Sequence, residues 1–263
     1  MKSTVLIRAK DEAAAIGRTL DLVAAADEVV VVDSGSHDDT GAIARRAGAR
    51  VIDIPAGSFT YGRALNVGCA AATGDVVIAL SAHAFPPDAG WVERVTAEFA
   101  DDRVACACGY DSGPDGAPLR GRVEQDQALL RRWPLWGYTN ASGGFRRSLW
   151  LERRFREDLP GTEDKEWAAH WIERGFVCVV DPALAVEHGH DDEDLRETYA
   201  RAEREWRGFA MYADLPPYPA TSLVREWWGD RDGRASAVRA RLSPRRAVQL
   251  AGKYAGRRRG LAR

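Results

Sequence analysis

Three histidines stand where they could bind a metal ion or another polar ligand. His83 lies just beyond a short apolar run at 76–80, with Ser81 two positions before it. Side chains just past the carboxyl end of a buried strand commonly bind ligands, although a solvent-facing loop histidine gives the same pattern. His188 and His190 are separated by one glycine. Two imidazoles at this spacing can bind one metal ion if the segment is irregular, and as a motif the pair is short and unspecific.

A cluster of acidic residues is the second candidate. In the stretch LPGTEDKEWAAHWI, at 159–172, Glu163 and Asp164 fall in the first turn of an expected helix. Carboxylates at this end of a helix complement its dipole. This stretch alone therefore requires no catalytic role for them.

The elements that would position these residues alternate between strands and helices. Apolar runs at 4–7, 28–32, 50–54, 76–80, 104–110 and 176–180 predict strands, and amphipathic segments between them predict helices. This order is typical of a doubly wound, mostly parallel α/β sheet, whose ligands bind at the carboxyl ends of the strands. We therefore expect the turns at 8–12, 33–36 and 81–83 to converge. We also predict a polar helix at 122–132, while the aromatic and glycine-rich residues 133–145 suit either a loop near a ligand or a strand under the sheet.

Length and composition exclude several classes of protein. The 263 residues are enough for one large domain or a domain with an appendage, so a small disulfide-stapled scaffold is excluded. The four cysteines lie in or beside apolar segments, as expected for core thiols in a reducing compartment. No apolar run approaches the roughly 20 residues of a membrane span, and the N-terminus shows no cleavage site. We expect a cytoplasmic protein.

The C-terminal segment differs in charge from the rest. Three prolines at 215–219 predict the end of the main fold, so we expect one domain at 1–213 and a helical tail at 214–263. Residues 234–263 contain nine Arg, one Lys and no acidic residue, and Trp227 and Trp228 precede them. Such a segment either forms a solvated face or attaches the protein to an anionic membrane surface or partner.

Four ordered stretches resemble glycosyltransferase family 2, whose members have the GT-A fold. They are VLIRAKDEAAAIGRTLDLV, VVVVDSGSHDDTGAIARRAGARVI, GRALNVGCAAATGDVVIALSAHAFPPDAGWVERV and GTEDKEWAAHWIERGFVCVVDPALAVEHGH. The resemblance spans about 5–190. It implies a cleft that binds a nucleoside-diphosphate sugar, at the carboxyl ends of the strands.

The resemblance also implies roles for individual residues. Asp33 would hydrogen-bond the nucleotide base. Ser34 and the turn formed by Arg8, Ala9, Lys10 and Glu12 would line the same pocket, Arg63 and Asn66 would face the donor sugar or diphosphate, and Ser81 and Ala82 would contact the donor.

One motif departs from the family pattern. Where the family has Asp-x-Asp, with the second Asp binding a divalent metal, this chain has Ser81-Ala82-His83. His83 could replace the carboxylate as a ligand of Mn²⁺ or Mg²⁺, joined by His188 or His190. The alternative is that no metal binds and cationic side chains such as Arg63 neutralise the diphosphate.

The expected reaction is attack of an acceptor hydroxyl on the anomeric carbon of the donor, with inversion. By resemblance Asp164 is the base that accepts the hydroxyl proton, and Glu163 is the alternative. The acceptor would be a glycan, a lipid-linked molecule or a small molecule, and no nucleic acid is involved. The "D-S-G-S" variant hints at a deoxysugar such as rhamnose.

Two other functions remain open. Because Asp-x-Asp is missing, the chain could be a catalytically silent GT-A module that binds a nucleotide sugar or glycan. A nucleotidyltransferase with a similar sheet is the second, although an N-terminal Gly-rich phosphate loop is missing.

Overall fold

The computed structural model describes residues 1–188, 193–228 and 243–261. The chain divides into two compact units. The first contains Met1–Asp158 and Glu163–Gly189, and the second contains Leu159–Thr162 and His190–Arg263.

The first unit is built on one sheet with the strand order β3-β2-β1-β4-β7-β5-β8-β6. Strands β1 to β4 pair in parallel, and so do β5 and β8, whereas β7 and β6 run antiparallel to their neighbours. The predicted mostly parallel sheet is therefore confirmed. The strands are β1 Ser3–Ala9, β2 Glu28–Asp33, β3 Arg50–Asp53, β4 Val76–Ser81, β5 Val104–Cys108, β6 Val123–Gln125, β7 Ser142–Arg146 and β8 Val177–Val180.

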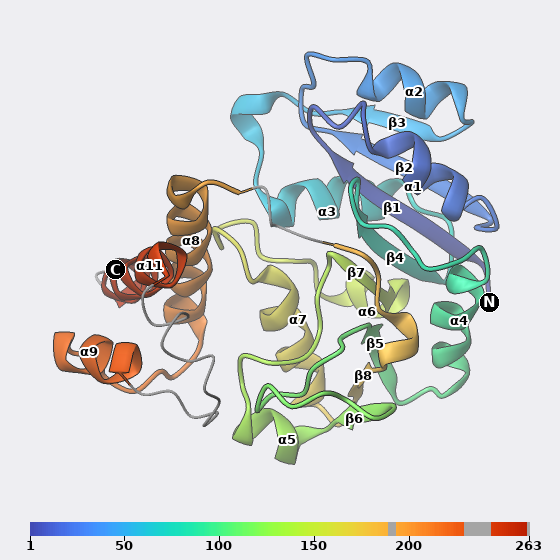
Figure 1. Ribbon diagram of the computed structural model, residues 1–263. Helices are drawn as coiled ribbons and strands as arrows, with labels where there is room; N and C mark the ends of the chain where they lie inside the picture. Colours follow the sequence, from blue (N-terminus) through green and yellow to red (C-terminus); the bar gives the residue numbers. More distant parts are fainter. Residues whose placement is uncertain (189–192, 229–242, 262–263) are drawn as a thin grey trace. The chain divides into compact units, whose positions relative to one another are not determined.

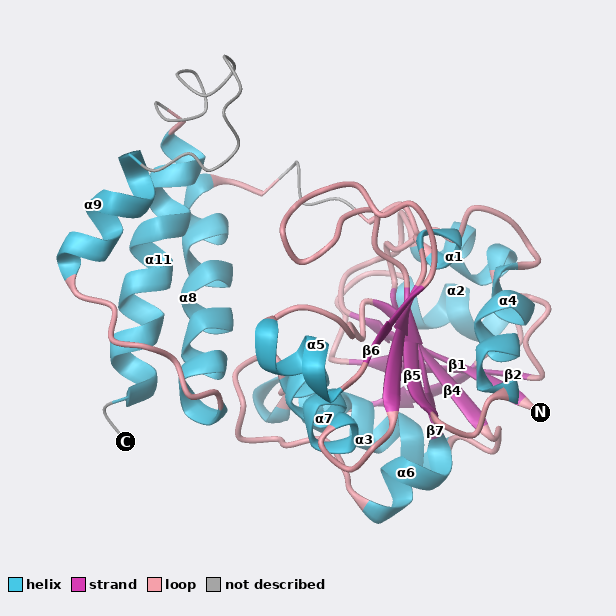
Figure 2. Cartoon of the chain, turned by 90° about the horizontal axis from the view of Figure 1, so that it is seen from below, coloured by secondary structure: helices cyan, strands magenta, loops and turns pink. Residues whose placement is uncertain are grey.

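Helices cover both faces of the sheet (Figures 1 and 2). One face packs against α1, α2 and α4, and the other against α3, α5, α6 and α7. Because both faces are buried, the central strands are apolar almost throughout instead of alternating. The helices are α1 Ile16–Leu22, α2 Thr40–Arg46, α3 Tyr61–Ala71, α4 Trp91–Ala97, α5 Gln127–Arg132, α6 Arg147–Glu152 and α7 Glu163–Ile172, with short 3-10 turns at Ala56–Ser58, Glu98–Ala100 and Pro182–Leu184.

The region 122–146 differs from the prediction at its start. Its first residues form the edge strand β6, and the helix begins only after Asp126, whose side chain accepts a hydrogen bond from the Leu129 amide. The aromatic and glycine-rich stretch ends in β7, in the middle of the sheet. A Cβ at Gly143 would lie 2.4 Å from the Thr139 carbonyl oxygen, so glycine permits this close packing.

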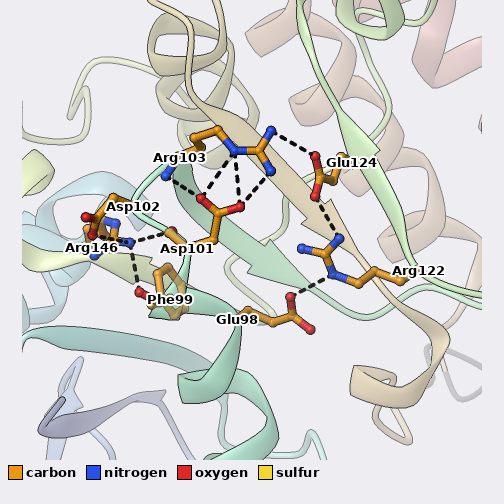
Figure 3. A network of polar contacts seen from close by, with 8 residues as sticks. All are labelled: Glu98, Phe99, Asp101, Asp102, Arg103, Arg122, Glu124 and Arg146. Carbon is orange, nitrogen blue, oxygen red and sulfur yellow. Dashed lines mark hydrogen bonds and ion pairs between the residues drawn. The ribbon is translucent and has the colours of Figure 1, made fainter.

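A polar network ties β7 and β6 to the segment that precedes β5 (Figure 3). The buried Arg146 guanidinium donates to the carbonyl oxygens of Phe99, Asp101 and Val104, at 2.6 to 2.9 Å. Arg103 binds both Asp101 and Glu124, and Arg122 joins Glu124 to Glu98. The antiparallel strand β7 is thereby anchored at its carboxyl end, while its amino end carries the loop that reaches the candidate site.

Among its described residues, the second unit has three helices: α8 Leu195–Tyr212, α9 Ala220–Trp228 and α11 Pro244–Leu261. Helix α11 lies alongside α8 (Figure 2), and its glycines meet α8 residues in ascending order, so the two helices run in the same direction. Gly252, Gly256 and Gly260 form the contact, because Cβ atoms at these positions would lie 2.3 to 2.6 Å from atoms of α8. Helix α8 and the residues of the predicted tail at 214–263 fall in the same compact unit, and a domain boundary at 213/214 stays a prediction.

Two further expectations concern the cysteines and membrane spans. All four cysteines are buried free thiols, which confirms their expected place in the core. Within the described ranges, no helix is both long and apolar enough to cross a membrane.

Candidate functional site

A cavity of about 310 Å³ lies at the carboxyl ends of β1, β2 and β4. The sequence predicted convergence at this place, because the carboxyl ends of parallel strands share one edge of a sheet. The lining includes seven of the predicted donor and metal residues. They are Arg8, Ala9, Lys10, Glu12, Ser34, Ser81 and His83, and Phe59 and Tyr61 complete the lining.

A sharp turn after β1 brings Glu12 to His83. Asp11 has a φ of 54°, in the left-handed region that Asp tolerates better than most residues. Glu12 then accepts a hydrogen bond from Nδ1 of His83 at 2.7 Å. This hydrogen bond raises the pKa of His83 above its usual range and fixes which imidazole nitrogen carries a proton.

His188 reaches His83 although the two are far apart in sequence. Phe85 and Glu187 form an antiparallel backbone bridge, with N···O distances of 2.9 Å in both directions. The Nε2 atoms of His83 and His188 lie 3.2 Å apart, and the two rings are inclined by only 9°. The predicted pairing of His83 with His188 is thus present in the structure, whereas His190 lies outside the described residues.

The Arg8 side chain contacts two other segments of the site. Its guanidinium donates to the Asn140 carbonyl oxygen at 3.0 Å and lies 5.6 Å from the centre of the Tyr61 ring. Its Nε is buried with no hydrogen-bond partner among the described atoms. We predicted a contribution from the backbone of this turn, and the side chain adds a positive charge at the cavity wall.

Asp164 is joined to Arg8 through one residue. Asn140 donates its backbone N–H to Oδ2 of Asp164 at 3.1 Å, while its carbonyl oxygen accepts from Arg8. Oδ1 of Asp164 accepts the Lys165 amide at 2.7 Å. A carboxylate has about four lone-pair sites, so both oxygens retain capacity to accept another proton donor.

Glu163 occupies a different environment from its neighbour. The residue is 3% exposed, whereas Asp164 is only half-buried. Burial, and then the Asp164 charge, raise the pKa of Glu163 to about 7, and Arg8 opposes this change. Near neutral pH Glu163 therefore holds a proton much of the time, so Asp164 is the better placed of the two to accept one.

Four predicted donor residues do not line the cavity. Asp33 is buried and accepts the Ser36 amide at 2.8 Å, which shapes its own turn. The Ala82 side chain is buried, and its carbonyl oxygen accepts from Thr19. Arg63 is exposed on α3.

Asn66 is the fourth of these residues, and its amide is used by the fold. Nδ2 donates to the Phe155 carbonyl oxygen and to Glu157, and Oδ1 accepts from Trp150 and from the Phe155 amide. These four hydrogen bonds hold the 150–157 segment against α3. A direct contact of Asn66 with the donor stays a prediction.

The sequence reasoning missed the two aromatic residues of the lining. Phe59 and Tyr61 pack edge to face, with ring centres 5.2 Å apart, just before and at the start of α3. The available signal was an aromatic pair around Thr60, whose side chain caps that helix by accepting the Arg63 amide. Flat apolar rings beside polar groups suit a planar ligand, whose faces pack against the rings and whose edges form hydrogen bonds.

The described residues offer specific side chains as ligands for the predicted metal ion. In the part of the chain that the structure describes, no group of three or more His, Cys, Asp or Glu is arranged to hold a metal ion. The His83 and His188 nitrogens form a pair, however. Two nitrogen ligands of one cation, each about 2.1 Å from it, lie roughly 3.0 to 3.4 Å apart. The observed 3.2 Å falls in this range and is also the distance of an N–H···N hydrogen bond between the two rings. Glu12 occupies the position in which a carboxylate commonly orients a metal-binding imidazole.

Comparison with known proteins gives matches in sequence and in structure. The model of the family "Glycosyl transferase family 2" matches residues 4–152. An O-antigen chain rhamnosyltransferase of Salmonella typhimurium is 25% identical over 181 residues, which cover 63% of this chain and 58% of the relative. A second such rhamnosyltransferase, from Salmonella anatum, is 25% identical over 179 residues, covering 62% and 57%. The chain thus matches less than two thirds of the length of these relatives.

Two solved structures share the fold. A mannosyltransferase from Pyrobaculum calidifontis, in complex with GDP-Man and Mn²⁺, superposes with a TM-score of 0.70 at 20% identity, covering 99% of this chain and 87% of the other. Glucosyl-3-phosphoglycerate synthase from Mycobacterium tuberculosis, in complex with Mn²⁺ and UDP-glucose, gives a TM-score of 0.61 at 18% identity, covering 82% and 80%. At these identities the likeness concerns the fold, and it agrees with the predicted GT-A architecture.

Proposed function

Since the chain belongs to glycosyl transferase family 2, we propose that it transfers a sugar from a nucleoside-diphosphate sugar to an acceptor hydroxyl, with inversion at the anomeric carbon. The observation that supports this most is the cavity at the carboxyl ends of β1, β2 and β4. Seven of its nine lining residues lie at or just after strand ends that the sequence had indicated.

Asp164 is the base in this proposal. An alcohol is a weak nucleophile at neutral pH, so a carboxylate accepts its proton as the new bond forms. The backbone N–H groups of Asn140 and Lys165 orient the Asp164 carboxylate. Glu163, whose pKa burial raises, has a supporting role instead.

Arg8 supports departure of the nucleoside diphosphate. Negative charge develops on the leaving diphosphate, and a fixed cation at a water-poor wall stabilises it. Arg8 is held in place by the Asn140 carbonyl oxygen and faces the cavity. This assigns to Arg8 the neutralising role that the sequence had suggested for Arg63.

His83 and His188 are the residues that would hold a divalent cation. Such a cation would add positive charge beside the diphosphate oxygens. Imidazole nitrogen suits Mn²⁺ better than Mg²⁺, which prefers oxygen ligands, so we propose Mn²⁺. The pair contributes only two ligands, and the other positions would go to phosphate and water oxygens.

The donor and acceptor are proposed from the relatives. Both curated relatives are rhamnosyltransferases of O-antigen chains, so a nucleoside-diphosphate rhamnose is the first donor to test, with a glycan as acceptor.

Attachment to the inner face of an anionic membrane is proposed through the basic segment 234–263. Arg258 and Arg259 are exposed on α11. Arg259 also pairs with Glu203 on α8 at 3.1 Å, and Lys253 binds Glu226 at 2.8 Å, so both of these cations have a partner within the unit. Because α11 packs on α8, a charge change such as Arg258→Gln with Arg259→Gln tests vesicle binding better than deleting the segment. Unchanged binding to anionic vesicles would count against attachment through these two residues.

The transferase proposal is tested by the release of free sugar. Purified protein is incubated with a panel of nucleoside-diphosphate sugars, with and without Mn²⁺, and free sugar is measured over hours. Slow release by the wild type, lost in Asp164→Asn while donor binding persists, is the expected result. Binding of a donor without any release would instead favour a catalytically silent binding module.

A further inference from the structure

Lys165 directs its ammonium group inward, toward a loop, although it sits on α7 beside Asp164. Nζ donates to the carbonyl oxygens of Gly137 at 3.3 Å and Tyr138 at 3.0 Å. It also lies 5.7 Å from the centre of the Tyr110 ring. Burial disfavours the charge, but Tyr110 and Asp164 hold the pKa of Lys165 above its ordinary value. The group is therefore an ammonium, which can only donate hydrogen bonds.

The loop that Lys165 holds is the one that contacts the proposed base. Two residues after Tyr138, Asn140 donates its N–H to Asp164 and accepts from Arg8. The Tyr138 hydroxyl also donates to the Asn140 side-chain oxygen at 2.8 Å. The orientation of Asn140 thus depends on Tyr138, whose carbonyl oxygen is bound by Lys165.

The start of this loop has little freedom to compensate for a lost contact. Gly137 has a φ of 110°, a conformation that glycine tolerates. A Cβ there would lie 2.0 Å from the side-chain oxygen of Gln125. Gln125 in turn donates to the Trp136 carbonyl oxygen at 3.0 Å. The loop is therefore fixed by β6 on one side and by Lys165 on the other.

We propose that Lys165 is a positioning residue that holds the loop at 137–140. Asn140 thereby keeps its hydrogen bonds to both the Asp164 carboxylate and the Arg8 guanidinium. This inference rests on the proposed function, because the base and the leaving-group cation are those of sugar transfer. Without the ammonium, two carbonyl oxygens lose their donor and Asn140 can shift. The cavity residues Ser34 and Phe59 come from other elements and stay in place.

The kinetic test compares Lys165→Met and Lys165→Arg with the wild type. A displacement of about 1 Å at a reacting group can lower the rate by about 10²-fold. We expect Lys165→Met to lower kcat by about 10- to 100-fold while the donor KM stays within about two-fold. Lys165→Arg, which keeps a charged donor, should recover part of this loss.

Arg153→Met is the matched control for loss of a contact on the same helix. It removes an ion pair with Glu166 on α7, at 2.5 Å, without touching the loop. We expect this variant to melt at a lower temperature with kcat close to that of the wild type. A folded Lys165→Met protein with kcat within about two-fold of the wild type would overturn the proposal, and so would an equal loss of kcat in Arg153→Met.

A second measurement does not depend on activity. Hydrogen exchange of the Asn140 amide should be at least about ten-fold faster in Lys165→Met, while the Ile54 amide, which donates to the Asp33 carbonyl oxygen, is unchanged. Unchanged exchange at Asn140 would refute the positioning role even if sugar transfer itself were not found. Should Lys165→Met fail to fold, Tyr138→Phe removes the hydroxyl that holds Asn140 and is expected to show the same kcat loss and faster exchange. A wild type that releases no sugar while Lys165→Met shows the faster exchange would refute the proposed function but not the contact.

Discussion

Replacing Glu163 with Gln tests whether burial raises the pKa of the Glu163 carboxyl group. Burial raises the pKa of Glu163 from 4.5 to about 7. Between pH 4.5 and about 7, Glu163 keeps its proton in the folded protein, whereas the unfolded chain has released it. The resulting contribution to stability is fully present below about pH 4.5 and is lost as the pH rises through about 7. The difference between the two pKa values corresponds to an upper limit of about 3 kcal/mol.

Glu163→Gln removes this ionisation, because glutamine is neutral at every pH. Relative to the wild type, the variant should gain stability as the pH rises from 5 to 8.5, by an amount approaching 3 kcal/mol. Urea unfolding across this range measures the free energy of unfolding of both proteins. Glu152→Gln, at an exposed position on α6, is the control and should follow the wild type. An identical pH dependence for Glu163→Gln and the wild type would show that the pKa of Glu163 is not raised in the folded protein.

Three other substitutions probe separate parts of the account. Arg8→Gln should lower kcat for sugar release by about 10² to 10³-fold, while Arg46→Gln, at an exposed position on α2, should not; equal rates would remove Arg8 from the mechanism. His188→Ala should weaken Mn²⁺ binding by at least about ten-fold, measured by electron paramagnetic resonance, with the exposed His37→Ala as control; equal Mn²⁺ affinity in both variants would contradict the His pair. Gly256→Ala places a Cβ 2.3 Å from the Glu203 carbonyl oxygen, so it should lower the free energy of unfolding by about 1 to 3 kcal/mol and with it the melting temperature. Gly121→Ala, whose Cβ would meet nothing within 4 Å, is the control, and equal melting temperatures would argue against close α8–α11 packing.

The strand ends could be predicted because their positions follow from local pattern and topology. Apolar runs marked the parallel strands, and all parallel strands present their carboxyl ends at one edge. Ser34, Ser81 and His83 therefore came together in the structure as expected. The predicted region that failed, at 122–132, contains a strand of only three residues, too short to give a periodic signal.

Contacts between distant segments could not be predicted in the same way. His188 meets His83 because Phe85 and Glu187 form a two-residue bridge, which leaves no pattern in either segment. Arg8 acquires its role from the Asn140 carbonyl oxygen, a backbone atom that no side-chain motif reports. Asn66 looked like a donor-binding residue because of its place on α3, whereas its neighbours in space decide its hydrogen bonds.

The packing of the C-terminal helices could not be predicted from composition. The prolines at 215–219 and the excess of Arg and Lys in 234–263 predicted a basic tail, but they did not indicate which helix it packs against. The glycines of α11 recur every four residues, and this spacing lets two helix backbones approach closely. That spacing permits the observed close packing of α11 on α8.

The central claim is that the donor binds in the cavity at the ends of β1, β2 and β4, with its diphosphate beside Arg8. A crystal structure of the protein with a bound nucleoside diphosphate tests this most directly. We expect phosphate oxygens within hydrogen-bonding distance of the Arg8 guanidinium and the nucleoside among the cavity residues Ser34, Phe59 and Tyr61. A nucleotide bound elsewhere, with this cavity empty, would contradict it.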